Sequence, residues 1–269
     1  MNPDPLAKFS WFPESESLYA RHLHEIVYSF VFYQVLASYI APRLNRVVFG
    51  KHYTGIKDAK LKLDFDIHTV SMVQCLISCY LLWPVLFLPH TVSIASYTNE
   101  YCSMLTSVSA GYFIWDMIVC CTNYSLYGWQ FVLHAAVALY GSLVPLSPMA
   151  QVWVPKFLLY EASTPFVNVN WFIMTLSKDR KRTVVPMWLN ALNGLCLMAV
   201  FFSVRIVWGH IAQFIYLFQM WDQWHELPQK RAFVLGLLTI VLNLLNILWF
   251  SKMVKIARKL NAGPAKRLD

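Results

Sequence analysis

Long apolar stretches joined by short polar connections dominate the chain. A helix that crosses a bilayer needs about 20 largely apolar residues, and about seven stretches approach or reach that length. They lie at 24–40, 68–88, 101–122, 130–147, 152–176, 185–207 and 233–254. A further apolar segment, 209–220, is too short to cross and is expected to form an interfacial or re-entrant helix. The pattern predicts an all-α membrane protein, a compact bundle of about seven transmembrane helices.

The composition supports the same class. Hydrophobic residues make up 58% of the 269 positions and charged residues only 13%, whereas a soluble domain carries about 25% charged residues. The first twenty residues lack the apolar core of a signal peptide, so the first apolar stretch is expected to act as its own insertion signal. An ordinary soluble globule is excluded.

Basic residues are distributed unevenly between the connections. With the N-terminus on the lumenal side, sixteen of the 22 lysines and arginines fall in connections on the opposite side or in the C-terminal segment, as expected of cytosolic loops. This predicts a lumenal N-terminus and a cytosolic C-terminus, and it explains the net charge of +8 without a nucleic-acid partner. The sequon at Asn123 would then face the cytosol and stay unglycosylated.

The sequence has no signature of soluble hydrolase, ATPase or metal chemistry. GxSxG, P-loop and HExxH motifs are absent. Cys75 and Cys79 share a helical face, but no histidine or acid completes a metal-ligand spacing around them. We therefore expect neither a bound metal nor a resident cofactor.

Polar residues within the apolar stretches are the candidate site. Tyr112 and Asp116 lie four residues apart in the third stretch and share a helical face. An ionisable group near the bilayer centre costs about 2.5 to 3.5 kcal/mol, so it normally faces the bundle interior and marks a functional path. In the fourth stretch, His134 is a candidate general base that Asp116 would orient. The alternatives are a structural bond between Tyr112 and Asp116 and a helix-packing role for His134.

The fifth stretch contains a polar stripe. Glu161, Thr164 and Asn168 recur at i, i+3 and i+7, and Pro165 favours a kink beside them. A kinked polar stripe is suited to line a lipid cavity or a substrate-binding site. The alternative is hydrogen bonding between neighbouring helices.

The sixth stretch adds two candidates for the same cavity, Asn193 and Arg205. Three interpretations of Arg205 remain open: it pairs with Glu161 or Asp116, it contacts an anionic head group, or it snorkels outward.

Several of these segments together resemble a known family. The runs GYFIWD, EASTPFVNVNWF and LNGLCLMAVFFSVRI, followed by LNILWFSKMVK, and the single histidine of the fourth stretch resemble the TLC-domain family over residues 61–260. The STPF-N-WF run at 163–172 is most similar to the group of TLC domain-containing protein 4 and its fungal relatives. The resemblance implies a TLC domain at 61–260, preceded by a tail at 1–23 and a first transmembrane helix with a basic loop at 24–60, and followed by a tail at 261–269. It also implies a multi-pass protein of the endoplasmic reticulum membrane with a part in lipid metabolism.

Ceramide synthases share the broader domain, and in them two adjacent histidines are implicated in transferring an acyl group from acyl-CoA to a sphingoid base. Here the corresponding positions are His134 and Ala135. Ala135 neither donates nor accepts a proton, so a mechanism that needs two imidazoles lacks one of them. Gln74 stands where animal relatives often carry a histidine in the second span.

Three functions remain open at this point. The first is a protein that binds a membrane lipid or acyl chain within its helical bundle and acts in lipid homeostasis, transport or control of membrane composition. The second is a ceramide-synthase-like acyltransferase with His134 as base and acyl-CoA as cosubstrate. The third is a cargo adaptor of the secretory pathway that uses exposed loops, with the loop 177–183 as its test.

Overall fold

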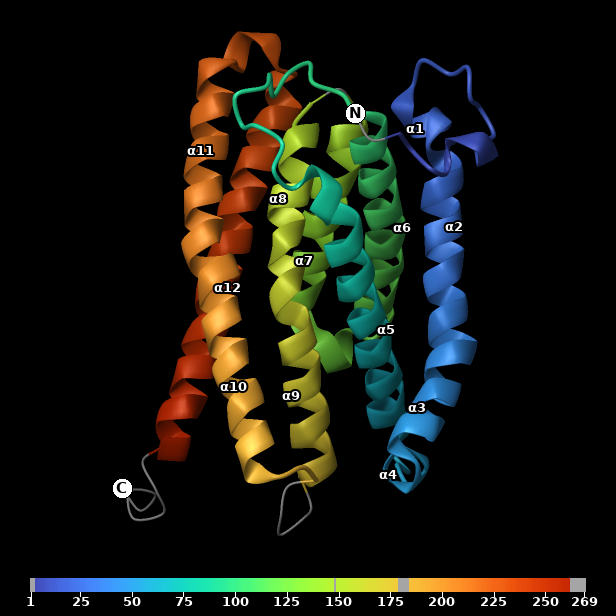
Figure 1. The fold of residues 1–269 in the computed structure, drawn as a ribbon, viewed down its shortest axis with the longest axis vertical. Helices are drawn as coiled ribbons and strands as arrows, with labels where there is room; N and C mark the ends of the chain where they lie inside the picture. Colours follow the sequence, from blue (N-terminus) through green and yellow to red (C-terminus); the bar gives the residue numbers. More distant parts are fainter. Residues whose placement is uncertain (1–2, 148, 179–183, 262–269) are drawn as a thin grey trace.

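The computed structural model describes residues 3–147, 149–178 and 184–261, and these residues form helices and connections without a β-strand. The helices run side by side along the long axis of the molecule (Figure 1).

The first half of the chain forms four helical columns. It begins with the short helices η1 (Ala7–Phe9) and α1 (Leu18–Arg21). The first column comprises α2 (Leu23–Val35), the π-helix η2 (Leu36–Ile40) and α3 (Ala41–Phe49), and α4 (Lys51–Thr54) follows. The next three are α5 (Ala59–Leu82) with η3 (Trp83–Val85), α6 (Glu100–Thr122), and α7 (Tyr124–Leu143) with η4 (Val144–Leu146).

The second half forms three further columns. The fifth comprises η5 (Gln151–Trp153), α8 (Val154–Leu158), the 3-10 helix η6 (Leu159–Ser163) and α9 (Thr164–Ser177). The sixth comprises α10 (Met187–Phe201), the π-helix η7 (Phe202–Val207) and α11 (Trp208–Asp222). After η8 (Trp224–Glu226), the last column is α12 (Gln229–Asn261).

Five stretches of the described chain are long and apolar enough to cross a membrane. They are Ala59–Val85, Glu100–Thr122, Tyr124–Leu146, Met187–Asp222 and Gln229–Arg258. The expected all-α membrane class is confirmed. Length and hydropathy support five crossings among the described residues, so the count of about seven is not confirmed.

The segment 209–220 differs from its expected form. It continues α10 without a break, through η7 and into α11, so that Met187–Asp222 is one helix of 36 residues. At about 1.5 Å per residue this helix is about 54 Å long, more than the hydrocarbon core of a bilayer. The expectation of a separate interfacial or re-entrant helix was wrong because no proline interrupts this stretch, and a lone glycine, Gly209, does not end a helix.

The helices α2 and α6 approach each other closely at Gly111. A β-carbon placed at Gly111 would lie 2.4 Å from the carbonyl oxygen of Ile26 and 2.6 Å from the β-carbon of Ser29. Ser29 Oγ also donates a hydrogen bond to the carbonyl of Val108 at 2.6 Å. Small residues at such contacts allow helix backbones to approach closely inside a membrane.

Many of the basic residues lie at one end of the bundle. The connection around α4, the end of α9 and the end of α12 lie together at one end of the bundle, and the N-terminal segment lies at the other (Figure 1). We name the first of these the basic end, because Lys51, Lys178 and Arg258 lie there. The charge asymmetry predicted from the sequence thus corresponds to two ends of one bundle.

Candidate functional site

A cavity of about 360 Å³ lies between α5, α6, α7, the η6 to α9 segment, η7 and α12, and we call it the polar chamber. Its volume is in the range of ligand pockets. The polar and charged side chains that line it are His68, Ser71, Tyr112, Asp116, Tyr127, His134, Glu161, Thr164, Asn168, Arg205 and Lys252. Because these six elements come from separate parts of the chain, the folding of the bundle brings these groups together.

A second cavity of about 100 Å³, which we call the apolar chamber, adjoins the first. Phe113, His134 and Glu161 line both chambers. The polar chamber uses residues 127–134 of α7 and 249–253 of α12, whereas the apolar chamber uses 134–142 and 235–242. The two are therefore stacked along the helix axes, with the polar chamber nearer the basic end.

The fifth column changes its helix type where its polar stripe begins. Glu161 lies in the 3-10 helix η6, and Pro165 is near the first turn of α9. A proline cannot donate the hydrogen bond that would continue an α-helix through this point. The change places Glu161, Thr164 and Asn168 on the wall of the polar chamber. Among the described residues, no hydrogen bond or salt bridge occupies the Glu161 carboxylate.

Arg205 points into the bundle and is only 6% exposed. Its guanidinium donates hydrogen bonds to Ser163 Oγ at 2.8 Å, Thr164 Oγ1 at 3.3 Å and Asn246 Oδ1 at 3.3 Å. It lies in the π-helix η7, and such local widening of a helix is frequent at functional sites. Within the described chain no carboxylate lies within salt-bridge distance of it, so its charge is available to an anionic group in the chamber.

His134 and Asp116 both face the polar chamber. Nδ1 of His134 is buried and has no hydrogen-bond partner in the described structure, and its ring lies 5.5 Å from the ring of Trp249, edge to face. Asp116 accepts a weak hydrogen bond from the Cys120 thiol at 3.8 Å. No hydrogen bond between Asp116 and His134 is present in the part of the chain that the structure describes.

A hydrogen-bonded chain that the sequence did not reveal runs along one wall. His68 donates from Nδ1 to Asn168 Oδ1 at 2.8 Å, and Asn168 in turn donates to Ser71 Oγ at 3.2 Å. On the other side of the ring, His68 Nε2 lies 3.7 Å from Asp64 Oδ1, which accepts a hydrogen bond from Tyr127 at 3.0 Å. The four-residue spacing of Asp64 and His68 was the signal available in the sequence.

Comparison with known proteins identifies the family. The TLC domain family model (TRAM_LAG1_CLN8) matches residues 64–255, most of the chain. The chain belongs to the TLC-domain family. It is 50% identical to Topoisomerase I damage affected protein 4 of Saccharomyces cerevisiae over 98% of this chain and 95% of that protein. It is also 28% identical to TLC domain-containing protein 4-B of Danio rerio over 91% and 92%, and 27% identical to TLC domain-containing protein 4 C of Dictyostelium discoideum over 90% and 88%.

The family and the group expected from the sequence are therefore confirmed. No solved structure matches the chain. Every residue that lines the two chambers lies within the matched TLC domain. The chambers are thus a feature of the TLC domain itself and not of the segments around it.

The TLC domain brings together seven of the eight site residues expected from the sequence. These seven line the polar chamber: Tyr112, Asp116, His134, Glu161, Thr164, Asn168 and Arg205. The eighth, Asn193, lies outside it and donates to the carbonyl of Phe166 at 3.2 Å. Gln74 bonds Tyr33 and Ser78 in the helix packing. Most of the loop 177–183 lies outside the described residues.

Proposed function

We propose that this TLC-domain protein binds a membrane lipid within its bundle, with the head group in the polar chamber and part of an acyl chain in the apolar chamber. The stacking of the two chambers along the helix axes carries this proposal. A lipid has the same order of polar and apolar parts, so one molecule would match both chambers at once. The protein would then act in lipid homeostasis, lipid transport or control of membrane composition.

The charges of the polar chamber support the head-group assignment. Arg205 is buried and has no carboxylate partner among the described residues, while Lys252 lies on the side of the chamber nearer the basic end. Glu161 and Asp116 add hydrogen-bond acceptors to the same lining. A head group with an anionic phosphate and hydrogen-bond donors would satisfy both sets of groups.

The same proposal includes the membrane arrangement. Five columns meet the length and hydropathy expected of a crossing, and we propose that the columns that contain α2 and α8 cross as well, which gives seven. The basic end would face the cytosol and the N-terminus the lumen of the endoplasmic reticulum. The lipid head group would then lie in the cytosolic half of the membrane.

Filling the apolar chamber tests the proposal. A β-carbon at Gly141 meets no atom within 4 Å, and Gly141 lines the apolar chamber. Gly141→Phe should displace the acyl chain, and mass spectrometry of co-purified lipid should show a loss of about tenfold. Gly194→Phe is the matched control, because Gly194 also meets nothing within 4 Å and lines neither chamber. Equal lipid content in both variants and wild type would contradict the proposal.

A second function, acyl transfer, is favoured by one observation. The unpartnered Nδ1 of His134 lies where the two chambers meet. As a general base it would take a proton from an acceptor amine or hydroxyl, while the acyl group passes from the thioester of acyl-CoA to the acceptor and the proton goes to the departing CoA thiolate. His134→Ala should abolish a new acylated product that the wild type makes. Undiminished product in that variant would exclude this mechanism, and bound but unmodified lipid in both proteins favours the first function.

A further inference from the structure

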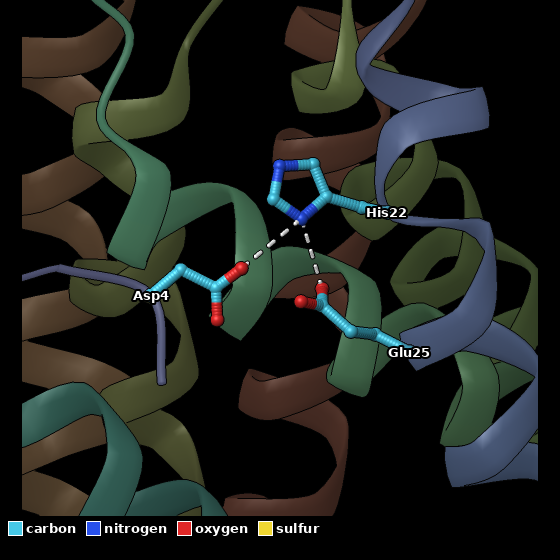
Figure 2. A group of neighbouring side chains, drawn as sticks. All are labelled: Asp4, His22 and Glu25. Carbon is cyan, nitrogen blue, oxygen red and sulfur yellow. Dashed lines mark hydrogen bonds and ion pairs between the residues drawn. The ribbon is translucent and has the colours of Figure 1, made fainter. Parts of the chain in front are cut away.

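One group of metal-ligating side chains in the described chain lies outside the two chambers, at the N-terminal end of the bundle. Asp4, His22 and Glu25 bring one ligand atom each to within 4.8 Å of one another (Figure 2). His22 Nδ1 lies 3.1 Å from Glu25 Oε2 and 3.7 Å from Asp4 Oδ2. Ligand atoms about 2.0 to 2.2 Å from a common zinc ion in tetrahedral geometry are separated by distances of this size.

The three side chains are almost completely buried. Asp4 and His22 are each 1% exposed at the side chain, and Glu25 is 0% exposed. Asp4 Oδ2, Glu25 Oε1 and His22 Nε2 form no hydrogen bond in the described structure. Glu25 Oε1 lies 3.5 Å from His24 Nε2, and His22 Nε2 lies 3.5 Å from Glu100 Oε2. Two buried carboxylates thus converge on one imidazole, and each of the three groups keeps an atom that makes no hydrogen bond. Buried charges of this kind are normally paired or coordinate metals.

The surrounding potential favours a cation. Carboxylate oxygens of Asp4, Glu25 and Glu100 lie 3.7, 3.1 and 3.5 Å from the ring nitrogens of His22. The nearest arginine, Arg21, is turned to Glu100 at 3.1 Å. No lysine or arginine of the described chain forms a salt bridge with Asp4 or Glu25.

The segment before α2 is held in place by its own backbone contacts. The Leu6 amide donates to Asp4 Oδ1 at 2.7 Å, and His24 Nε2 bonds the Leu6 carbonyl at 3.1 Å. Asp4 is therefore presented to His22 by a folded segment, and its position does not depend on a bound ion.

We propose that Asp4, His22 and Glu25 bind a divalent transition-metal ion, with Zn²⁺ as the preferred ion. One imidazole nitrogen and two carboxylate oxygens are ligands that zinc accepts, and three protein ligands leave a fourth position for water or another group. The imidazole disfavours Mg²⁺ and Ca²⁺, which prefer oxygen ligands only. The ligands would join the N-terminal segment to the start of α2, so the ion would clamp this segment onto the bundle.

This site is independent of lipid binding. Its three residues precede the matched TLC domain, which begins at residue 64, and none lines either chamber. The spacing gave no sequence signal, because Asp4 is 18 residues from His22 and belongs to no known ligand motif.

The test uses the full chain purified with a tag that contains no histidine. After removal of metal with a chelator, the protein is titrated with Zn²⁺, Mg²⁺ and Ca²⁺ by calorimetry, and retained zinc is counted by elemental mass spectrometry. We expect one zinc per chain. Asp4→Asn and Glu25→Gln should each weaken zinc binding more than about tenfold, whereas Glu16→Gln, an exposed acid of the same segment, should bind as the wild type does.

A second measurement, the absorption spectrum of the wild-type protein with bound Co²⁺, does not depend on whether any variant folds. Replacing zinc with cobalt should produce the visible absorption of a four-coordinate ion. No zinc retained by the wild type, calcium bound in preference to zinc, or equal zinc in Asp4→Asn and wild type would each overturn the proposal.

Discussion

Gly111 lies at a close contact between α2 and α6. A methyl group there would meet backbone and the β-carbon of Ser29 at 2.4 to 2.6 Å, and neither can move without shifting a helix. Gly111→Ala should therefore lower the free energy of unfolding by about 1 to 3 kcal/mol, as overpacking does in a tight core. Thermal unfolding in detergent measures it. Gly141→Ala is the control, since its β-carbon enters open space, and an equal melting temperature for both variants would contradict the close contact.

Arg205 allows a test of head-group charge at the same scale. A charge-assisted hydrogen bond contributes about 1.5 to 3 kcal/mol, so Arg205→Gln should reduce co-purified anionic lipid about tenfold relative to neutral lipid. Arg205→Lys keeps the charge without the planar fork and should retain part of it. The exposed Arg258→Gln, outside the chambers, is the matched control. An unchanged ratio of anionic to neutral lipid in Arg205→Gln would show that the head group does not meet this side chain.

At the residue scale the sequence indicated which polar groups line a common cavity, but not which of them bond to one another. Ionisable groups inside a membrane are costly and converge on the bundle interior, which brings Asp116, Glu161 and Arg205 to one cavity. The sequence did not mark His68 as a site residue, because it lies at the start of an apolar stretch, next to the charged residues of the preceding loop. Whether such a residue faces inward depends on the rotation of α5, which the pattern of a single helix does not determine.

At the scale of elements, helix continuity was harder to predict than helix existence. The π-helix η7 lies between α10 and α11 and lets Arg205 turn inward without ending the helix. In the sequence, the same arginine looked like the end of a span. A charged residue inside an apolar stretch can therefore mark either the end of a span or an inward-facing site. For Arg205, its hydrogen bonds to Ser163, Thr164 and Asn246 identify the second case.

The continuous helix predicts a lipid-facing stripe along α11. Ile211, Phe214 and Phe218 are 48%, 73% and 64% exposed and recur at helical spacing. Spin labels at these positions in lipid vesicles should be accessible to oxygen and shielded from a water-soluble relaxation agent, at depths that change steadily along the helix. Labels on the buried positions Ala212 and Tyr216 are not suitable controls, so Trp221, 81% exposed near the helix end, serves instead and should be accessible from water. A single common depth for all four labels would indicate an interfacial helix.

For the whole molecule, the class and the family followed from hydropathy and a few motifs, because the bilayer restricts spanning segments to a narrow set of structures. A polar cavity was expected, but its size and its division into two chambers did not follow from the sequence, because they depend on how far apart six elements stand. The same holds for the cluster of Asp4, His22 and Glu25, which requires the N-terminal segment to fold back against α2.

The positions of the connections at the two ends of the bundle predict which of them can be glycosylated. The N-terminal segment and the connection between α5 and α6 lie at one end of the bundle, and the basic end lies at the other (Figure 1). With seven crossings, a glycosylation sequon added through a flexible linker at the N-terminus, or inserted in the connection 86–99, should be modified in the lumen of the endoplasmic reticulum. A sequon appended to the C-terminus and the natural one at Asn123 should remain unmodified. Gel mobility before and after treatment with a glycosidase shows which sequons carry a glycan. Glycans on both terminal sequons, or on the C-terminal one alone, would contradict seven crossings in this orientation. The result also decides the side of the membrane from which a lipid head group enters, because the polar chamber lies nearer the basic end.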